Sequence, residues 1–65
     1  MKNYLSSRRK ELKLTQPQVA ERAKLSNYTV VQRYERGVVM PSVEIALRLA
    51  KALETTVENL FELDD

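Results

Sequence analysis

The chain has 65 residues, a length that suits one domain and leaves no room for a second. Its residues are 43% hydrophobic and 31% charged, with no apolar run longer than three, so nothing predicts disorder, a membrane span or a secretory signal peptide. Cys and His are both missing, which removes disulfides, the usual zinc ligands and the imidazole base. We therefore expect a single cytoplasmic domain over residues 1–65 that is not an enzyme and has no metal, cofactor or small-molecule ligand. One Gly and two Pro in so short a chain favour a helical bundle.

Charge is divided unevenly along the chain. Residues 1–36 carry nine Lys/Arg against three Glu, a net charge of +6, whereas residues 37–65 carry two against six, a net charge of −4. A basic front and an acidic back favour a polyanionic partner for one face, and the pI of 9.2 agrees with nucleic acid. A solvated surface whose charges are separated along the chain by chance would give the same net charges, so charge alone leaves both interpretations open.

The first predicted helix runs from about Asn3 to Leu12. Leu5 and Leu12 lie seven residues apart on one face, and Arg8 and Arg9 fall on the same stripe. Because an arginine on a core-facing stripe must be compensated, each of the two needs a partner elsewhere in the fold.

The second helix begins at Thr15, which forms a potential capping box with Gln18, and ends by Leu25. Its apolar face is Val19, Ala20 and Ala23. The third begins after Ser26 or Asn27, both good N-caps, and ends at Gly37. We expect Val31 and Tyr34 to face inward and the opposite face to carry Tyr28, Thr29, Gln32 and Arg36.

The fourth helix begins at Pro41-Ser42 and the fifth at Thr56. The fourth shows the clearest helical periodicity of apolar residues, and its solvent-facing side carries Glu44 and Arg48, paired at i, i+4. Its predicted buried side consists of Val43, Ala46, Leu47, Leu49, Ala50 and Leu53. The fifth contributes Val57, Leu60 and Phe61, and the acidic end from Glu62 to Asp65 is expected to fray.

The order and spacing of these segments resemble the Cro/phage-repressor (XRE-type) helix-turn-helix family. The matching blocks are LTQPQVAER at 14–22, YERG at 34–37, PS at 41–42 through AKAL at 50–53, and VENLF at 57–61. Together they cover essentially residues 3–62. The resemblance implies an all-α, compact five-helix bundle of the lambda-repressor-like type, with the helix-turn-helix at about residues 15–36.

In that family the helix after the turn enters the major groove of double-stranded DNA. The resemblance therefore implies base-reading positions, phosphate-backbone positions and an ion pair between Arg9 and Glu35. The base-reading candidates are Asn27, Tyr28, Thr29 and Gln32. The backbone candidates are Gln16, Gln18, Lys24, Ser26, Arg33 and Arg36. The alternative is that these side chains only solvate an exposed helix face.

The chain departs from the family at its turns. Lys13, Lys24 and Glu54 stand where the family usually has glycine, and one extra residue separates Ala20 from Gly37. We place that residue in the turn near Ser26-Asn27, because a loop absorbs an insertion more easily than a packed helix. Asn27 is then the best candidate for a positive φ. A buried Val30 with an exposed Val31 would instead place the insertion inside the third helix.

The loop Val38-Val39-Met40 is apolar where the family is often basic or polar. These residues either cover the chain's own core or contact a second subunit. The sequence as a whole predicts a Cro-like homodimer that binds a palindromic operator, most simply as a repressor, in a prokaryotic or phage nucleoid. The alternative is a protein-interaction module on the same scaffold, such as an antitoxin-like protein that binds its partner through this loop and the acidic end.

Overall fold

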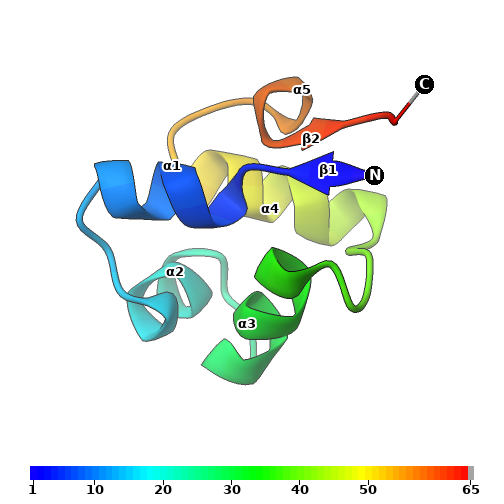
Figure 1. Cartoon of the computed structure of the whole chain (residues 1–65). Coiled ribbons are helices and arrows are strands. Elements are labelled where there is room, and N and C mark those ends of the chain that lie inside the picture. The colour runs from blue at the N-terminus through cyan, green and yellow to red at the C-terminus, as the bar shows by residue number, and fades with distance from the viewer. Residues whose placement is uncertain (65) are drawn as a thin grey trace.

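The computed structural model describes residues 1–64 and contains five helices and a two-stranded ladder (Figure 1). The elements are β1 (Lys2–Asn3), α1 (Leu5–Glu11), α2 (Gln16–Arg22), α3 (Tyr28–Arg36), α4 (Val43–Ala52), α5 (Val57–Leu60) and β2 (Phe61–Glu62). In Figure 1, α2 and α3 lie on one side of α1 and α4, α5 and β2 lie on the other, and β1 runs directly into α1. The predicted five-helix bundle is confirmed. None of the helices in residues 1–64 is long and apolar enough to cross a membrane.

Four of the helices begin at a side-chain cap that the sequence predicts. At α2 the capping box is complete: the Gln18 amide donates to Thr15 Oγ1 at 3.2 Å, and the Thr15 amide donates to Gln18 Oε1 at 2.8 Å. Asn27, Ser42 and Thr56 cap α3, α4 and α5 in turn. Such caps satisfy backbone donors that the first helical turn leaves without partners, so these short segments start at defined residues.

The first four helices all end in the same way, with one left-handed residue just after the last turn. Its φ values are 58° at Lys13, 59° at Lys24, 74° at Gly37 and 55° at Glu54. In each case the amide of the following residue bonds back five positions, as in Leu25 N to Ala20 O at 2.8 Å, which is the Schellman pattern. Only one of these four positions has the glycine that this conformation favours.

The prediction that Asn27 has a positive φ is wrong. Its φ is −161°, because an N-cap residue is extended while its side chain accepts the amide of the residue two positions on. Lys24 itself takes the left-handed conformation. The extra residue lies in the turn, since Val31 is 1% exposed and Val30 only half-buried.

All five helices contribute to one core, whose largest fully buried side chains are Leu5, Val19, Val31, Leu49, Leu53 and Leu60. The prediction for α4 is wrong at two positions: Val43 is 79% exposed and Leu47 is 58% exposed. The apolar face of α4 is wider than the stripe that the rest of the chain covers. The residues of α4 that face the core are the half-buried Ile45 and the buried Ala46, Leu49, Ala50 and Ala52. The loop residues Val38, Val39 and Met40 are exposed as well, so the alternative that this loop covers the chain's own core is wrong.

The two ends of the chain are paired, which the sequence did not predict. β1 and β2 are antiparallel, with Lys2 opposite Glu62 and Asn3 opposite Phe61, so α1 begins later than expected. Residues 62–64 therefore do not fray: the N-terminal ammonium pairs with Asp64, and the Tyr4 hydroxyl donates to Glu62. This bond and the negative charge of Glu62 raise the pKa of Tyr4. Asp65 lies outside the described residues.

Candidate nucleic-acid interface

The predicted helix-turn-helix is present as α2, the turn from Ala23 to Asn27, and α3. The two helices pack directly on each other, with Ala20 buried in α2. A small residue is required there, because helices that cross over a tight turn approach closely. Leu25, half-buried in the turn, packs against the core and anchors the connection.

One face of α3 is exposed along the whole length of the helix. Val31 on the opposite face is buried and Tyr34 is half-buried. The exposed residues are Tyr28, Thr29, Gln32, Arg33 and Arg36. This face combines hydrogen-bonding groups in the first half of the helix with positive charge in the second half.

Some candidate side chains around this face are free of hydrogen bonds within the described residues 1–64, whereas others already take part in helix caps. Lys24 and Ser26 are exposed in the turn. Asn27 Oδ1 accepts the Thr29 amide at 2.9 Å, and Gln18 Oε1 is held in the α2 capping box. The carbonyl oxygens of these two amide side chains therefore serve as helix caps, and a ligand would meet their NH₂ groups.

A largely buried polar network fixes α3 against α1 and α2. Arg9 Nε donates to Glu35 Oε2 at 2.6 Å and Arg9 Nη2 donates to Glu35 Oε1 at 3.2 Å, with the two side chains 14% and 8% exposed. Arg9 Nη1 also donates to the Leu14 carbonyl at 3.0 Å, and Gln16 Nε2 donates to Glu35 Oε1 at 3.0 Å. Arg9 therefore has the partner that its position requires. Gln16, a backbone candidate, is half-buried and joins the beginning of α2 to α3 in the same network.

Asn3 is a positioning residue that sequence reasoning missed. Its side-chain NH₂ donates to the Tyr34 carbonyl at 3.2 Å and the Glu35 carbonyl at 3.4 Å, while its Oδ1 accepts the Leu5 amide at 3.2 Å. Asn3 thus accepts an amide from the first turn of α1 and holds the last turn of α3. The only sequence signal was an asparagine near the beginning of a helix, which indicates a local bond to a backbone amide but not the contact with α3.

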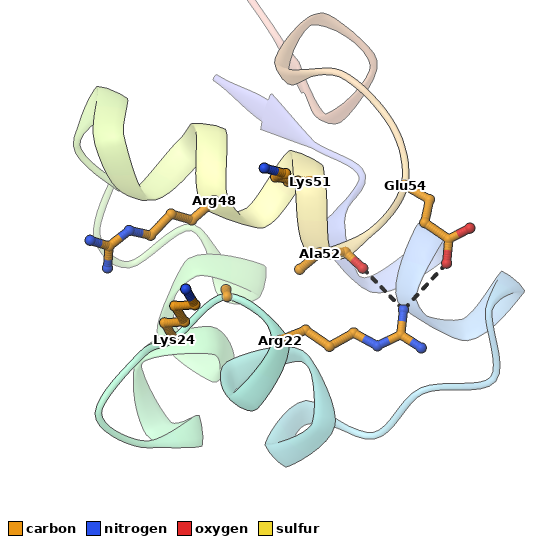
Figure 2. A pocket seen from close by; sticks show the side chains of 7 residues that line it. Arg22, Lys24, Arg48, Lys51, Ala52 and Glu54 are labelled. Carbon is orange, nitrogen blue, oxygen red and sulfur yellow. Dashed lines mark hydrogen bonds and ion pairs between the residues drawn. The ribbon is translucent and has the colours of Figure 1, made fainter.

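Four cations line a cleft between α2 and α4, namely Arg22, Lys24, Arg48 and Lys51 (Figure 2). Figure 2 shows Arg22 directed at the end of α4, where its Nη1 donates to the Ala52 carbonyl at 3.2 Å and to Glu54 Oε2 at 3.3 Å. On α4 itself, Arg48 pairs with Glu44 at 2.5 Å.

Arg8, on α1, also binds the C-terminal end of α4. Its Nε donates to the Leu53 carbonyl at 2.9 Å and its Nη2 donates to the Glu54 carbonyl at 3.0 Å. The carbonyls that end α4 therefore bind arginines from two other helices. Cations are favourable at a helix C-terminus, so Arg22 and Arg8 stabilise the end of α4 while they join α2 and α1 to it.

Comparison with known proteins agrees with this geometry. The family model described as helix-turn-helix matches residues 5–60. A relative from Methanothermobacter thermautotrophicus is 38% identical over 66 aligned positions, which cover 100% of this chain and 94% of the relative. That relative carries the name uncharacterized HTH-type transcriptional regulator.

Proposed function

Because the chain belongs to the helix-turn-helix family, we propose that it is a transcriptional regulator that binds double-stranded DNA sequence-specifically. The observation that carries the proposal is the exposed face of α3, polar in its first half and basic in its second, on a helix fixed by the Arg9–Glu35–Gln16 network. A recognition helix must be both exposed and rigidly oriented, since its side chains have to meet base edges in register.

The proposed base-reading residues are Asn27, Tyr28, Thr29 and Gln32, at and just after the beginning of α3. The side-chain amide of Gln32 can bond an adenine edge through two atoms, and the Thr29 methyl can contact a thymine methyl. The NH₂ group of Asn27 can donate to an acceptor on a base edge while its oxygen remains in the cap.

The proposed phosphate contacts are Gln16, Gln18, Lys24, Ser26, Arg33 and Arg36. They surround α3 on the turn, on the first turn of α2 and on the basic half of α3 itself. The Gln16 NH₂ has two hydrogens, so it can donate to Glu35 and to a phosphate oxygen together. In that arrangement Gln16 would transmit the position of the DNA backbone to α3.

We further propose that the regulator acts as a homodimer on a palindromic operator, most simply as a repressor. A single α3 covers few base pairs, whereas two copies on half-sites about 34 Å apart convert modest affinity into useful affinity.

Selection from a random duplex DNA pool at moderate salt tests the function. We expect enrichment of an inverted repeat with half-sites about one helical turn apart, and binding to the selected duplex that falls steeply with salt. Weak, salt-sensitive retention without any enriched sequence would refute sequence-specific recognition. That result would favour the protein-interaction module, for which the exposed apolar residues are the supporting observation.

A further inference from the structure

The cleft between α2 and α4 carries more positive charge than the fold itself uses (Figure 2). Its volume is about 550 Å³, within the ~300–1,000 Å³ that is typical of small-molecule sites. Four cations line it against a single carboxylate, that of Glu54. The cations come from the last residue of α2, from the turn that follows and from α4, and they are Arg22, Lys24, Arg48 and Lys51.

The two arginines of the cleft already have a carboxylate each, whereas the two lysines do not. Arg22 pairs with Glu54 at 3.3 Å, and Arg48 pairs with Glu44 at 2.5 Å. Both lysines are exposed, and no carboxylate of residues 1–64 lies within ion-pair distance of either one. The cleft therefore has an excess of two positive charges.

The helix ends that border the cleft do not depend on the two lysine side chains. The end of α2 is closed by backbone amides, those of Lys24 and of the residue after it, and the end of α4 binds Arg22 and Arg8. These bonds already satisfy the carbonyls at which a cation would be favourable. Because like charges that share a cleft repel each other, an anion between the two lysines would be stabilising.

We infer that this cleft binds a compact anion that carries phosphate groups. Lys24 and Lys51 would act on it as point charges, and Arg48 as a planar fork, because phosphate oxygens accept hydrogen bonds from both kinds of cation. Arg48 Nη2 donates to Glu44, which leaves its Nε and Nη1 for the ligand. Such an anion is a small-molecule ligand, which composition did not predict, and it lies beyond the proposed function, which assigns no ligand to α4.

Charge at the two ends of the cleft favours a compact anion over a nucleic-acid strand. In Figure 2, Arg22 extends to Glu54 at one end, and Arg48 lies at the other end, where Glu44 pairs with it. A groove that binds a strand stays positive along the path of the backbone. Here a strand that continued past the lysines would bring its next phosphates towards a carboxylate on either side, and like charges repel.

Titration of the ¹⁵N-labelled full chain with sodium pyrophosphate, followed by amide NMR shifts at constant ionic strength, tests the inference without DNA. We expect saturable shifts that are largest for the amides lining the cleft, at Ala23, Lys24, Lys51 and Ala52. Constant ionic strength separates binding in the cleft from general screening of the basic half of the chain.

The test variant is Lys51→Gln, and the matched control is Lys10→Gln. Both lysines are exposed and lie in the last turn of a helix, so both substitutions remove the same charge from a similar place, but Lys10 does not line the cleft. We expect the pyrophosphate dissociation constant to rise about 5- to 10-fold in Lys51→Gln and by less than about twofold in the control. Lys24→Gly should raise it similarly, and glycine suits the φ of 59° there, so unfolding would not explain that loss.

Salt titration of binding to a duplex of random sequence distinguishes a free anion from a DNA phosphate. We expect Lys51→Gln to leave the salt slope unchanged, whereas a slope reduced by about one in this variant but not in Lys10→Gln would assign the cleft to the DNA backbone and overturn the inference. Equal pyrophosphate dissociation constants in the two variants, or shifts confined to other surfaces, would also overturn it. Because the NMR titration contains no DNA, binding in the cleft supports the inference even if DNA selection fails, and its absence leaves sequence-specific recognition intact.

Discussion

Replacing Glu35 by alanine should destabilise the fold far more than any exposed ion-pair substitution. The carboxylate accepts three hydrogen bonds, two from Arg9 and one from Gln16, and its side chain is only 8% exposed. In Glu35→Ala the Arg9 side chain, which is 14% exposed, keeps only the Leu14 carbonyl as a partner unless the fold moves. Removing one member of such a buried pair costs about 3–5 kcal/mol. For a domain of this size that lowers the melting temperature by roughly 20–35 °C.

Thermal melts followed by circular dichroism measure the effect, with Glu44→Ala as the control. Glu44 also pairs with an arginine, but its side chain is 71% exposed, so its loss should change stability by less than about 0.5 kcal/mol. The double variant Arg9→Met/Glu35→Leu should recover much of the loss, because an apolar pair leaves no unpaired charge in the interior. A Glu35→Ala melt equal to that of Glu44→Ala would refute the assignment of this pair to the interior.

Four further substitutions test the helix ends and the DNA contacts. Lys24→Gly should stabilise the fold by about 0.5–1 kcal/mol in chemical denaturation, because the strain that glycine relieves at φ 59° exceeds the entropy that it adds to the unfolded chain. Gly37→Ala should destabilise the fold by a similar amount through its positive φ alone, since an added Cβ would meet open space. A loss of stability in Lys24→Gly would contradict this account. Gln32→Ala should weaken binding to the selected operator by about 10- to 100-fold while leaving non-specific binding unchanged, and an equal loss on both DNAs would show that Gln32 does not read a base. Arg36→Ala should weaken binding to all duplexes alike and reduce the salt slope by about one, so an unchanged slope in titrations at several salt concentrations would remove Arg36 from the phosphate contacts.

The parts of the fold that the sequence predicts well are those decided within a few residues. Thr15 with Gln18, Asn27, Ser42 and Thr56 each satisfy amides two or three positions away, so a local pattern suffices to place the beginnings of α2 to α5. The inward orientation of Val31 follows likewise from its spacing before Gly37. The exposed face of α3 could be predicted for the same reason.

The β1–β2 ladder could not be predicted, because it joins residues about sixty positions apart and each strand has only two residues. No periodicity can be read in two residues. Asn3, assigned to the first helix, instead belongs to this ladder and holds the end of α3. The angle of α3 thus depends partly on a contact that only the closed fold creates.

Residue preferences misled the prediction at the turn after α2. Asparagine tolerates a positive φ better than lysine, but the Schellman bonds from the last turn of α2 determine which residue must be left-handed, and that residue is Lys24. Helix-end geometry therefore outweighed the preference of the single residue. The same geometry explains the positive φ of Lys13 and Glu54.

The exposed Val43 and Leu47 show that hydrophobic periodicity reports which face of a helix avoids water, not which molecule covers that face. This distinction links stability to assembly. A domain of this length has only about 3–10 kcal/mol of net stability, and each left-handed residue other than glycine removes roughly 1 kcal/mol. Burial of these two side chains against a second copy would add stability that the monomer lacks. In the proposed dimer, the contact that spaces the two recognition helices therefore also helps to keep each of them folded.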